Sequence, residues 1–120
     1  YVYTERGDLD HAVSELKEAL RLQPGHANAH NNLGAVYCQK GLFDMAQQEF
    51  LAAVSYDPRN ASAHKNIGMI YLTKGDKERA RSHLREMLKY DLNYLRNPDI
   101  YAIVSDLGLI KNQVAPQSNE

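Results

Sequence analysis

Apolar and small side chains recur at the spacing of an α-helix in successive stretches of the chain. Two stretches carry the same stripe, first at Ala29, Leu33, Val36 and Tyr37 and then at Ala63, Ile67, Ile70 and Tyr71. Each is followed by a second stripe, at Ala46, Phe50, Ala53 and Val54 and then at Ala80, Leu84, Met87 and Leu88. Side chains three and four residues apart share one face of a helix, so the pattern predicts amphipathic helices in consecutive pairs.

The pattern returns every 34 residues, which makes it an internal repeat rather than a series of unrelated helices. Tyrosines, glycines and alanines are in register at Tyr3, Tyr37 and Tyr71, at Gly7, Gly41 and Gly75, and at Ala12, Ala46 and Ala80. A fixed period of roughly 20–50 residues is typical of stacked repeat proteins, in which each unit buries its apolar face only against its neighbours. We therefore expect two complete repeats, 27–60 and 61–94.

Glycine and proline positions predict where the helices end and how closely they pack. Gly41 and Gly75 follow the first helix of each repeat, where glycine adopts a left-handed conformation at the lowest steric cost. Pro58 closes the first complete repeat, because it has no N–H with which to continue a helix. Gly34 and Gly68 are in register within the first helices and predict a close approach of each helix pair.

Both ends of the chain depart from the repeat. Residues 1–26 read as a partial repeat, with the end of a first helix over 1–6 and a full second helix over 9–22. We therefore expect further repeats before Tyr1, and this uncovered end is a candidate route to self-association or to a larger complex. Residues 113–120 are polar and predict a flexible tail.

A capping segment, 95–112, is expected after the second complete repeat, because the repeat signals stop there. Asn97 followed by Pro98 is typical of a helix start. The apolar stripe that follows predicts a helix as far as Lys111, which closes the last hydrophobic face of the stack. Gly108 lies inside this predicted helix and weakens it by about 1 kcal/mol relative to alanine.

These spacings resemble the tetratricopeptide repeat family, whose pattern is Trp-x2-Leu-Gly-x2-Tyr, then Ala-x3-Phe, then Pro. The two complete repeats read His30-x2-Leu33-Gly34-x2-Tyr37, Ala46-x3-Phe50 and Pro58, and then His64-x2-Ile67-Gly68-x2-Tyr71 and Ala80-x3-Leu84. The resemblance implies an all-α fold, a right-handed α-solenoid of antiparallel helix pairs, here with a C-terminal capping helix. Histidine stands in the tryptophan slot as a packing residue, and Leu92 replaces the proline where the regular array ends.

Composition and charge narrow the classes of function. Hydrophobic residues make up 43% of the 120 residues and charged residues 24%, which is ordinary for a soluble globular protein. The formal net charge of −1 provides no global field for nucleic acid or an anionic membrane. No apolar run approaches the roughly 18 residues of a membrane span. The compartment stays open, with the cytoplasm slightly favoured over the periplasm.

In this family the first helices line a concave groove that takes an extended peptide or a partner's helix, and the resemblance projects that groove onto defined positions here. The first repeat contributes Asn28, Asn31, Asn32, Ala35 and Gln39, and the second contributes Ser62, Lys65, Asn66, Met69 and Thr73. Asn32 and Asn66 occupy the same slot, and a carboxamide can pair with both the N–H and the C=O of a peptide unit. They resemble the asparagine ladder of peptide-binding members; the alternative is a tolerated polar residue on a solvated helix.

A different groove chemistry is the carboxylate clamp of chaperone-binding family members. That clamp needs lysine and arginine around the asparagine to hold a C-terminal carboxylate. Lys65 and Arg96 are suitably placed, but neutral or apolar residues fill its other slots, at Asn31, Ala35 and Ile100. The clamp is therefore incomplete.

A second, basic surface is predicted along the second helix of the last complete repeat. Its residues are spaced by four and share one face: Lys77, Arg81, Arg85 and Lys89. This stripe suits an acidic partner or a lipid headgroup. However, acidic residues share the helix, and a helix of mixed charge is usually a solvated face.

No set of residues in the sequence predicts catalysis, a cofactor or a metal site. A nucleophile with a base and an orienting group, a phosphate-binding glycine loop and a carboxylate pair are all missing. His26 and His30 are four apart, but no carboxylate or cysteine nearby completes a ligand set. Cys38 has no cysteine partner and no basic cluster, so it reads as a small groove-lining side chain. Asn60 fits a helix N-cap better than a glycosylation site.

Together these features predict a non-enzymatic protein–protein interaction module. It would bind an extended peptide or partner segment in the concave groove and act as an adaptor or scaffold, with no nucleic acid partner. One alternative is a structural subunit of a larger assembly, in which apolar Leu42, Phe43 and Leu51 would matter most. Another is a regulatory or substrate-docking segment of a larger enzyme.

Overall fold

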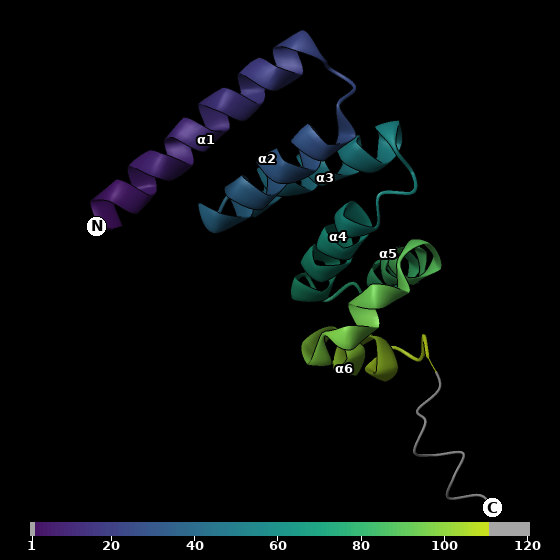
Figure 1. The fold of residues 1–120 in the computed structure, drawn as a ribbon. Helices are drawn as coiled ribbons and strands as arrows, with labels where there is room; N and C mark the ends of the chain where they lie inside the picture. Colours follow the sequence, from purple (N-terminus) through teal and green to yellow (C-terminus); the bar gives the residue numbers. More distant parts are fainter. Residues whose placement is uncertain (1, 111–120) are drawn as a thin grey trace, which may run out of the picture.

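A computed structural model describes residues 2–110, with side chains from residue 7 onward, and every regular element in this range is helical. The elements are α1 (Val2–Leu22), α2 (Ala27–Gln39), α3 (Phe43–Tyr56), α4 (Ala61–Thr73), α5 (Lys77–Tyr90), the 3-10 helix η1 (Leu92–Arg96) and α6 (Pro98–Asp106). Figure 1 shows them stacked in sequence order, with α1 at one end and α6 at the other. The predicted all-α solenoid is confirmed.

Two glycines determine how closely the paired helices pack. A Cβ atom added to Gly34 would lie 2.5 Å from the ring of Phe50, and one added to Gly68 would lie 2.7 Å from the Leu84 side chain. Both distances are far below ordinary van der Waals contact, so a larger residue at either glycine would force the helices apart. The predicted close approach of α2 to α3 and of α4 to α5 is confirmed.

Gly41 and Gly75 end the first helix of each pair, as the sequence predicts. Their φ angles are +79° and +84°, in the left-handed region that favours glycine. After α2, the N–H of Leu42 donates to the Tyr37 carbonyl at 2.8 Å and the N–H of Gly41 donates to the Cys38 carbonyl at 2.9 Å. The same two bonds recur after α4. They satisfy the last carbonyls of the helix and turn the chain back along it.

The first helix of each complete pair also begins in the same way. Nδ1 of His26 accepts a hydrogen bond from the Ala29 N–H at 3.1 Å, and Oδ1 of Asn60 accepts one from the Ala63 N–H at 3.0 Å. His26 and Asn60 occupy the same slot of the repeat. Each side chain supplies an acceptor for an N–H that has no partner within the helix. The predicted N-cap role of Asn60 is confirmed.

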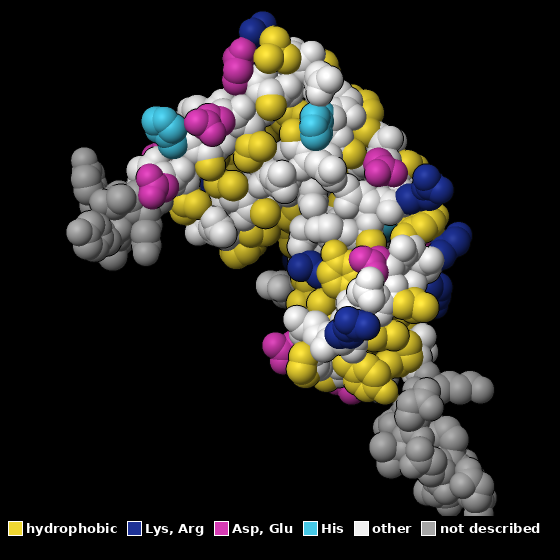
Figure 2. Space-filling model, viewed as in Figure 1, with side chains coloured by type: hydrophobic (Ala, Val, Ile, Leu, Met, Phe, Trp, Pro, Cys, Tyr) yellow, Lys and Arg dark blue, Asp and Glu magenta, His cyan; other side chains and the backbone are white. Residues whose placement is uncertain are grey.

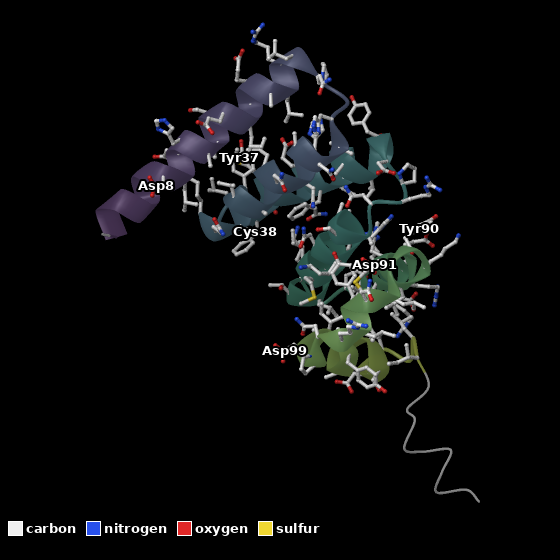
Figure 3. The ribbon with its side chains drawn as sticks, in the orientation of Figure 1. Asp8, Tyr37, Cys38, Tyr90, Asp91 and Asp99 are labelled. Carbon is white, nitrogen blue, oxygen red and sulfur yellow. The ribbon has the colours of Figure 1, made fainter. Side chains whose placement is uncertain are left out.

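Two clusters of buried side chains hold the stack together. The first surrounds Phe50 and joins α2, α3 and α4 with partly buried residues of α1. Tyr37, labelled in Figure 3, belongs to this cluster. The second surrounds Leu84 and Met87 and includes Val104 of α6. Each helix pair therefore buries its apolar stripe against its neighbours, and α6 covers the last pair.

An exposed ion pair links neighbouring helix pairs and recurs with the repeat. Lys40 pairs with Asp10, and Lys74 pairs with Asp44, with 3.2 Å between Nζ and Oδ1 in the second case. The two lysines are in register, as are the two aspartates. Surface ion pairs contribute only about 0–1 kcal/mol, so these contacts help to set the register of stacking more than the stability. Sequence analysis missed them, although the common spacing was visible.

The predicted break in the first helix is wrong. The sequence suggested one helix over 1–6 and another over 9–22, but α1 runs without interruption through Gly7. Gly7 lacks the positive φ of Gly41 and has no heavy atom within 4 Å of the position a Cβ would take. A helix turns back at a glycine when packing against a partner helix stabilises the turn. No described residue packs against Gly7 in this way.

The predicted capping helix is too long. We expected it to reach Lys111, but α6 ends at Asp106. Gly108 has a φ of +76°, and its N–H and that of Leu109 bond back to the last turn of α6. Gly108 therefore ends the helix, because it meets the same requirement for a left-handed residue as Gly41. The sequence also gave no sign of η1; Lys111 and the predicted tail over 113–120 lie outside the described residues.

Candidate partner-binding groove

α2 exposes one stripe of small and polar side chains. Its members are spaced by three and four residues, and all are exposed: Asn28, Asn32, Ala35 and Gln39. The corresponding residues of α4 are partly or fully exposed: Ser62, Asn66, Met69 and Thr73. These eight side chains, which we call the inner stripe, lie on the faces that the sequence assigned to the groove.

A network of side-chain hydrogen bonds joins α2 to α4 beside this stripe. Nδ2 of Asn31 donates to Oγ of Ser62 at 3.0 Å, and Nδ2 of Asn66 donates to Oδ1 of Asn31 at 3.0 Å. A third bond, also 3.0 Å long, runs from Nδ2 of Asn60 to Oδ1 of Asn28. The two helices are therefore neighbours in space, and the parts of the inner stripe that they carry form one surface.

Asn31 departs from its predicted role. Only 8% of it is exposed, and both ends of its amide are engaged by α4. The repeat pattern placed Asn31 on the groove surface, but the approach of α4 covers it. Asn31 therefore joins α2 to α4 and does not form part of the exposed inner stripe.

The two asparagines of the expected ladder are not equivalent. Asn32 is exposed on α2, whereas Asn66 is partly buried and donates one hydrogen bond to Asn31. Its second N–H and its carbonyl oxygen are not engaged by the described side chains. Both amides can therefore pair with a peptide backbone, with Asn66 held in a more fixed orientation.

A pocket with a volume of about 390 Å³ opens where α4 meets η1 and the start of α6. Its lining residues are Lys65, Asp91, Asn93, Tyr94, Arg96, Asn97 and Ile100. Figure 3 labels Asp91, which precedes η1, and Asp99, which follows it. The volume lies near the lower end of the roughly 300–1,000 Å³ that binding pockets span, so it suits one or two residues of a peptide.

Two acceptor atoms of this pocket are already used in local hydrogen bonds. Oδ1 of Asp91 accepts the N–H of Asn93 at 2.9 Å. Oδ1 of Asn97 accepts the N–H groups of Asp99 and Ile100 at 2.9 Å and 3.1 Å, which caps α6 as the sequence predicts. The lining also includes the second carboxylate oxygen of Asp91 and the side-chain oxygens of Asn93 and Tyr94, so the pocket offers acceptors as well as donors.

Two cations of the pocket remain available. Nζ of Lys65 lies 6.0 Å from the centre of the Tyr94 ring, and Arg96 is exposed. Neither residue forms an ion pair with another described side chain. The apolar Ile100 and the neutral Ala35, named above as gaps in a carboxylate clamp, supply no further charge.

The predicted basic surface on α5 is not a uniform stripe. Nε of Arg81 donates to the Leu107 carbonyl at 3.0 Å, so this residue binds the end of α6. Nζ of Lys89 lies 5.4 Å from the centre of the Tyr90 ring, and Lys77 and Arg85 are exposed. The equivalent residues of the preceding units are Val13 and Gln47, so this contact with the cap is specific to the last repeat.

The histidines in the tryptophan slot anchor each first helix to the preceding turn. Nε2 of His30 donates to the Pro24 carbonyl at 2.8 Å, and Nε2 of His64 donates to the Pro58 carbonyl at 2.7 Å. Within residues 7–110, no group of three His, Cys, Asp or Glu side chains is arranged to hold a metal ion. Sequence analysis treated these histidines as packing residues and missed the hydrogen bonds.

Cys38, labelled in Figure 3 near the end of α2, is half-buried. Burial raises the pKa of its thiol above the ordinary value, because the thiolate loses contact with water. A thiol of this kind is protonated at neutral pH and reacts slowly. Its surroundings fit the structural role that the sequence suggested.

The two halves of the molecule differ in charge. Acidic residues outnumber basic ones between residues 7 and 60, and basic residues outnumber acidic ones between 61 and 110. Figure 2 shows acidic side chains spread along α1, whereas most of the lysines and arginines in view lie around α4–α6. Among the described helices, none combines the length with the apolar character that a membrane span requires.

Solved structures that resemble this chain are helical repeat proteins. "Crystal structure of MamA" matches with 26% identity and a TM-score of 0.67, covering 74% of this chain and 52% of that one. A structure titled "Functional Characterization of Pseudomonas Aeruginosa pilF" matches with 27% identity and a TM-score of 0.72, covering 89% and 48%. This chain thus spans about half the length of each.

A third structure, the translocator chaperone SycD of the Yersinia enterocolitica type III secretion system, shares the fold at 15% identity. Its TM-score is 0.71, and the match covers 88% of this chain and 76% of that one. No curated protein matches the chain. Family models match two overlapping segments, one described as a TPR repeat over residues 1–41 and one as a tetratricopeptide repeat over residues 37–92. The chain belongs to the tetratricopeptide repeat family and is a helical protein–protein interaction module.

Proposed function

We propose that this chain binds an extended peptide or partner segment along the inner stripe and serves as an adaptor or scaffold. One observation carries the proposal. Apart from Met69, the inner stripe consists of small and polar residues at equivalent positions of α2 and α4, and hydrogen bonds hold these two helices side by side. A surface of this kind offers amide groups to a peptide backbone at a regular spacing, without requiring a particular side chain.

The pocket beside η1 would add selectivity for an acidic residue of the partner. Lys65 and Arg96 lack ion-pair partners within the described residues, and both line the pocket. Asp91 in the wall leaves a small positive balance, which suits a single carboxylate better than a doubly charged phosphate. The more basic half of the chain surrounds this pocket.

The proposal is tested by selecting peptides from a displayed random library and measuring their affinity by fluorescence anisotropy. Ala35→Arg places a long charged side chain in the middle of the inner stripe and should weaken binding at least about tenfold, which corresponds to about 1.4 kcal/mol. Gln48→Arg is the matched control, because Gln48 is an exposed residue of α3 outside the stripe. Equal losses in both variants, or none in either, would exclude binding at the inner stripe.

The pocket has its own test with the same peptides. Arg96→Gln should weaken peptides that carry an aspartate, a glutamate or a free C-terminal carboxylate, and added salt should reduce the difference. Arg85→Gln removes an exposed charge outside the pocket and is the control. If the selected peptides lack acidic groups and bind the Arg96 variant normally, the pocket is not selective even though the groove binds.

A role as an assembly subunit is the second candidate, and one observation favours it. Leu42, Phe43 and Met45 are 39%, 51% and 45% exposed and lie together at the start of α3. Leu51, which the sequence grouped with them, packs instead against the first core cluster. Phe43→Ser should turn a self-associating chain into a monomer in sedimentation measurements. A wild-type chain that is already monomeric at high concentration would count against self-assembly through this patch.

The proposed activity is binding and not catalysis. Within the described residues, the side chains best suited to acid–base catalysis are the histidines. The contacts of His26, His30 and His64 cap helices or join a helix to the preceding turn. We therefore expect the chain to act through the partner that it holds.

A further inference from the structure

The two complete repeats differ at one pair of equivalent positions. His30 and His64 share a slot on the first helices, and Glu49 and His83 share the slot opposite them on the second helices. Nδ1 of His30 lies 2.8 Å from Oε1 of Glu49, whereas Nδ1 of His64 lies 3.1 Å from Nδ1 of His83. The same contact is therefore made to a carboxylate in one repeat and to a second imidazole in the other.

Hydrogen-bond chemistry places the protons in both contacts. A carbonyl only accepts, so the Nε2 of His30 and of His64 each carry the proton that bonds to a proline carbonyl. Neutral His64 then has a lone pair at Nδ1 and accepts the Nδ1–H of His83. His30, by contrast, has an oxygen opposite each ring nitrogen, the Pro24 carbonyl at Nε2 and the Glu49 carboxylate at Nδ1.

The groups around the histidine pair are mostly aromatic or positive. Tyr71 of α4 stacks on His83 with 5.8 Å between ring centres, and Tyr90 of α5 lies 6.4 Å from His64. Arg79 lies 5.9 Å from the Tyr71 ring, and Lys89 lies 5.4 Å from the Tyr90 ring. From the turn between α3 and α4, the oppositely charged Asp57 and Arg59 border a pocket shared with Tyr90.

The pKa of His83 is lowered from its ordinary value of 6.5. Burial is the largest cause, and the neighbouring His64 adds to it. Glu86 acts in the opposite direction and only partly offsets the decrease. Charging His83 in the folded chain is therefore unfavourable on two independent grounds.

We propose that the second complete repeat is an acid-sensitive element, in which the His64–His83 contact holds α4 against α5 near neutral pH and gives way on acidification. The first complete repeat lacks this sensitivity, because a positive His30 attracts the Glu49 carboxylate while two positive histidines repel each other.

Two protonation steps account for the loss of the contact. A first proton on Nε2 of His83 keeps the Nδ1–H bond but charges a half-buried ring. A second proton on Nδ1 of His64 removes the acceptor, and the two rings then repel. The unfolded chain binds the His83 proton more readily than the folded chain, because the fold lowers the pKa of His83, so the free energy of unfolding falls as the pH drops below about 6.5.

The loosening has a consequence for binding. α4 carries Lys65, Asn66 and Met69, so a partner held in the groove would be released in acid. This consequence rests on the proposed function, but the loosening itself does not, and a measurement of stability without any partner tests it separately.

Denaturant unfolding at about pH 7.5 and about pH 5.5 tests the proposal with variants that exchange the two contacts. In the wild-type chain, acidification should raise the unfolding equilibrium constant about tenfold more than in His83→Glu, which copies the first repeat. The reason is that the unfolded wild-type chain binds about one proton more than the folded chain over about one pH unit below 6.5. His83→Gln, which does not titrate, should behave like His83→Glu. Glu49→His should add acid sensitivity to the first repeat.

The proposal is overturned if the wild type, His83→Glu and His83→Gln respond equally to acid. It is also overturned if amide hydrogen exchange, expressed as protection factors, shows α2 and α3 opening in acid at least as much as α4 and α5. A nitrogen-15 NMR spectrum of the histidine side chains at neutral pH supplies an independent readout, with Nε2–H expected for His64 and Nδ1–H for His83. Should Glu49→His fail to fold, the two His83 variants still decide the outcome.

Discussion

At the scale of single residues, the packing of Gly34 against Phe50 and of Gly68 against Leu84 shows how one missing methyl group determines the architecture. The ring of Phe50 occupies the space that a side chain at residue 34 would need. Glycine costs helix stability in isolation, yet in these two slots it allows the helices to approach and bury their apolar stripes. The low helix propensity of glycine is outweighed by the close packing that glycine permits.

Replacing Gly34 by alanine should therefore destabilise the chain in spite of alanine's higher helix propensity. We expect a loss of about 1–3 kcal/mol in the free energy of unfolding, measured in urea, because Phe50 must leave its place. Gly7→Ala is the matched control, since Gly7 is helical and its missing Cβ faces open space. That variant should gain about 0.5–1 kcal/mol. Stabilisation by both substitutions would show that Gly34 is not needed for packing.

At the scale of helices, the sequence predicted the elements of the repeat better than those at its ends. Periodic apolar residues and the register of Gly41 with Gly75 were sufficient for α2 to α5, because every repeat supplies independent evidence. The end elements lacked that support. Gly7 and Gly108 carry the same residue type in different roles, one inside a helix and one ending it, and only the neighbouring helices decide between them.

The candidate site was predictable to a similar degree. The family resemblance placed Asn28, Asn32 and Ala35 on an exposed face, and all three are exposed on α2. It misplaced Asn31, which lies at the edge of that face, where the neighbouring helix decides its burial. The pocket at Lys65 was missed because η1 forms much of its wall and a single 3-10 turn has no periodic signal.

The attachment of α6 yields a prediction at this scale. Arg81 of α5 donates to the Leu107 carbonyl, so Arg81→Gln should weaken the cap by about 1 kcal/mol and increase hydrogen exchange in α6. Arg85→Gln removes an exposed charge from the same helix and should leave that exchange unchanged. Equal exchange in both variants would indicate that apolar packing alone holds α6.

At the scale of the whole molecule, the repeats are coupled through contacts between first helices as well as through the core. Asn31 is the central residue of that coupling, because it bonds to both Ser62 and Asn66. Repeat proteins depend on such interfaces, since each unit is stable only with its neighbour. The stack therefore behaves as one body only while these contacts persist.

Asn31→Ala should cost about 1–3 kcal/mol of unfolding free energy, because it removes a buried amide and leaves its partly buried partners on α4 without hydrogen bonds. Asn32→Ala makes the same change one residue later, on the exposed stripe, and should change stability by no more than about 0.5 kcal/mol. Urea unfolding measures both. Equal effects would mean that the network between α2 and α4 adds nothing to the coupling.

The most direct test of the central claim is an NMR chemical-shift map of the chain with a peptide selected by display. We predict that the backbone and side-chain amides of α2 and α4 that move most lie on the inner stripe, at Asn28, Asn32, Gln39 and Asn66, with further shifts around Arg96 for acidic peptides. Shifts confined to the start of α3 or to the outer face of α5 would contradict binding in the groove and support docking through the outer helices.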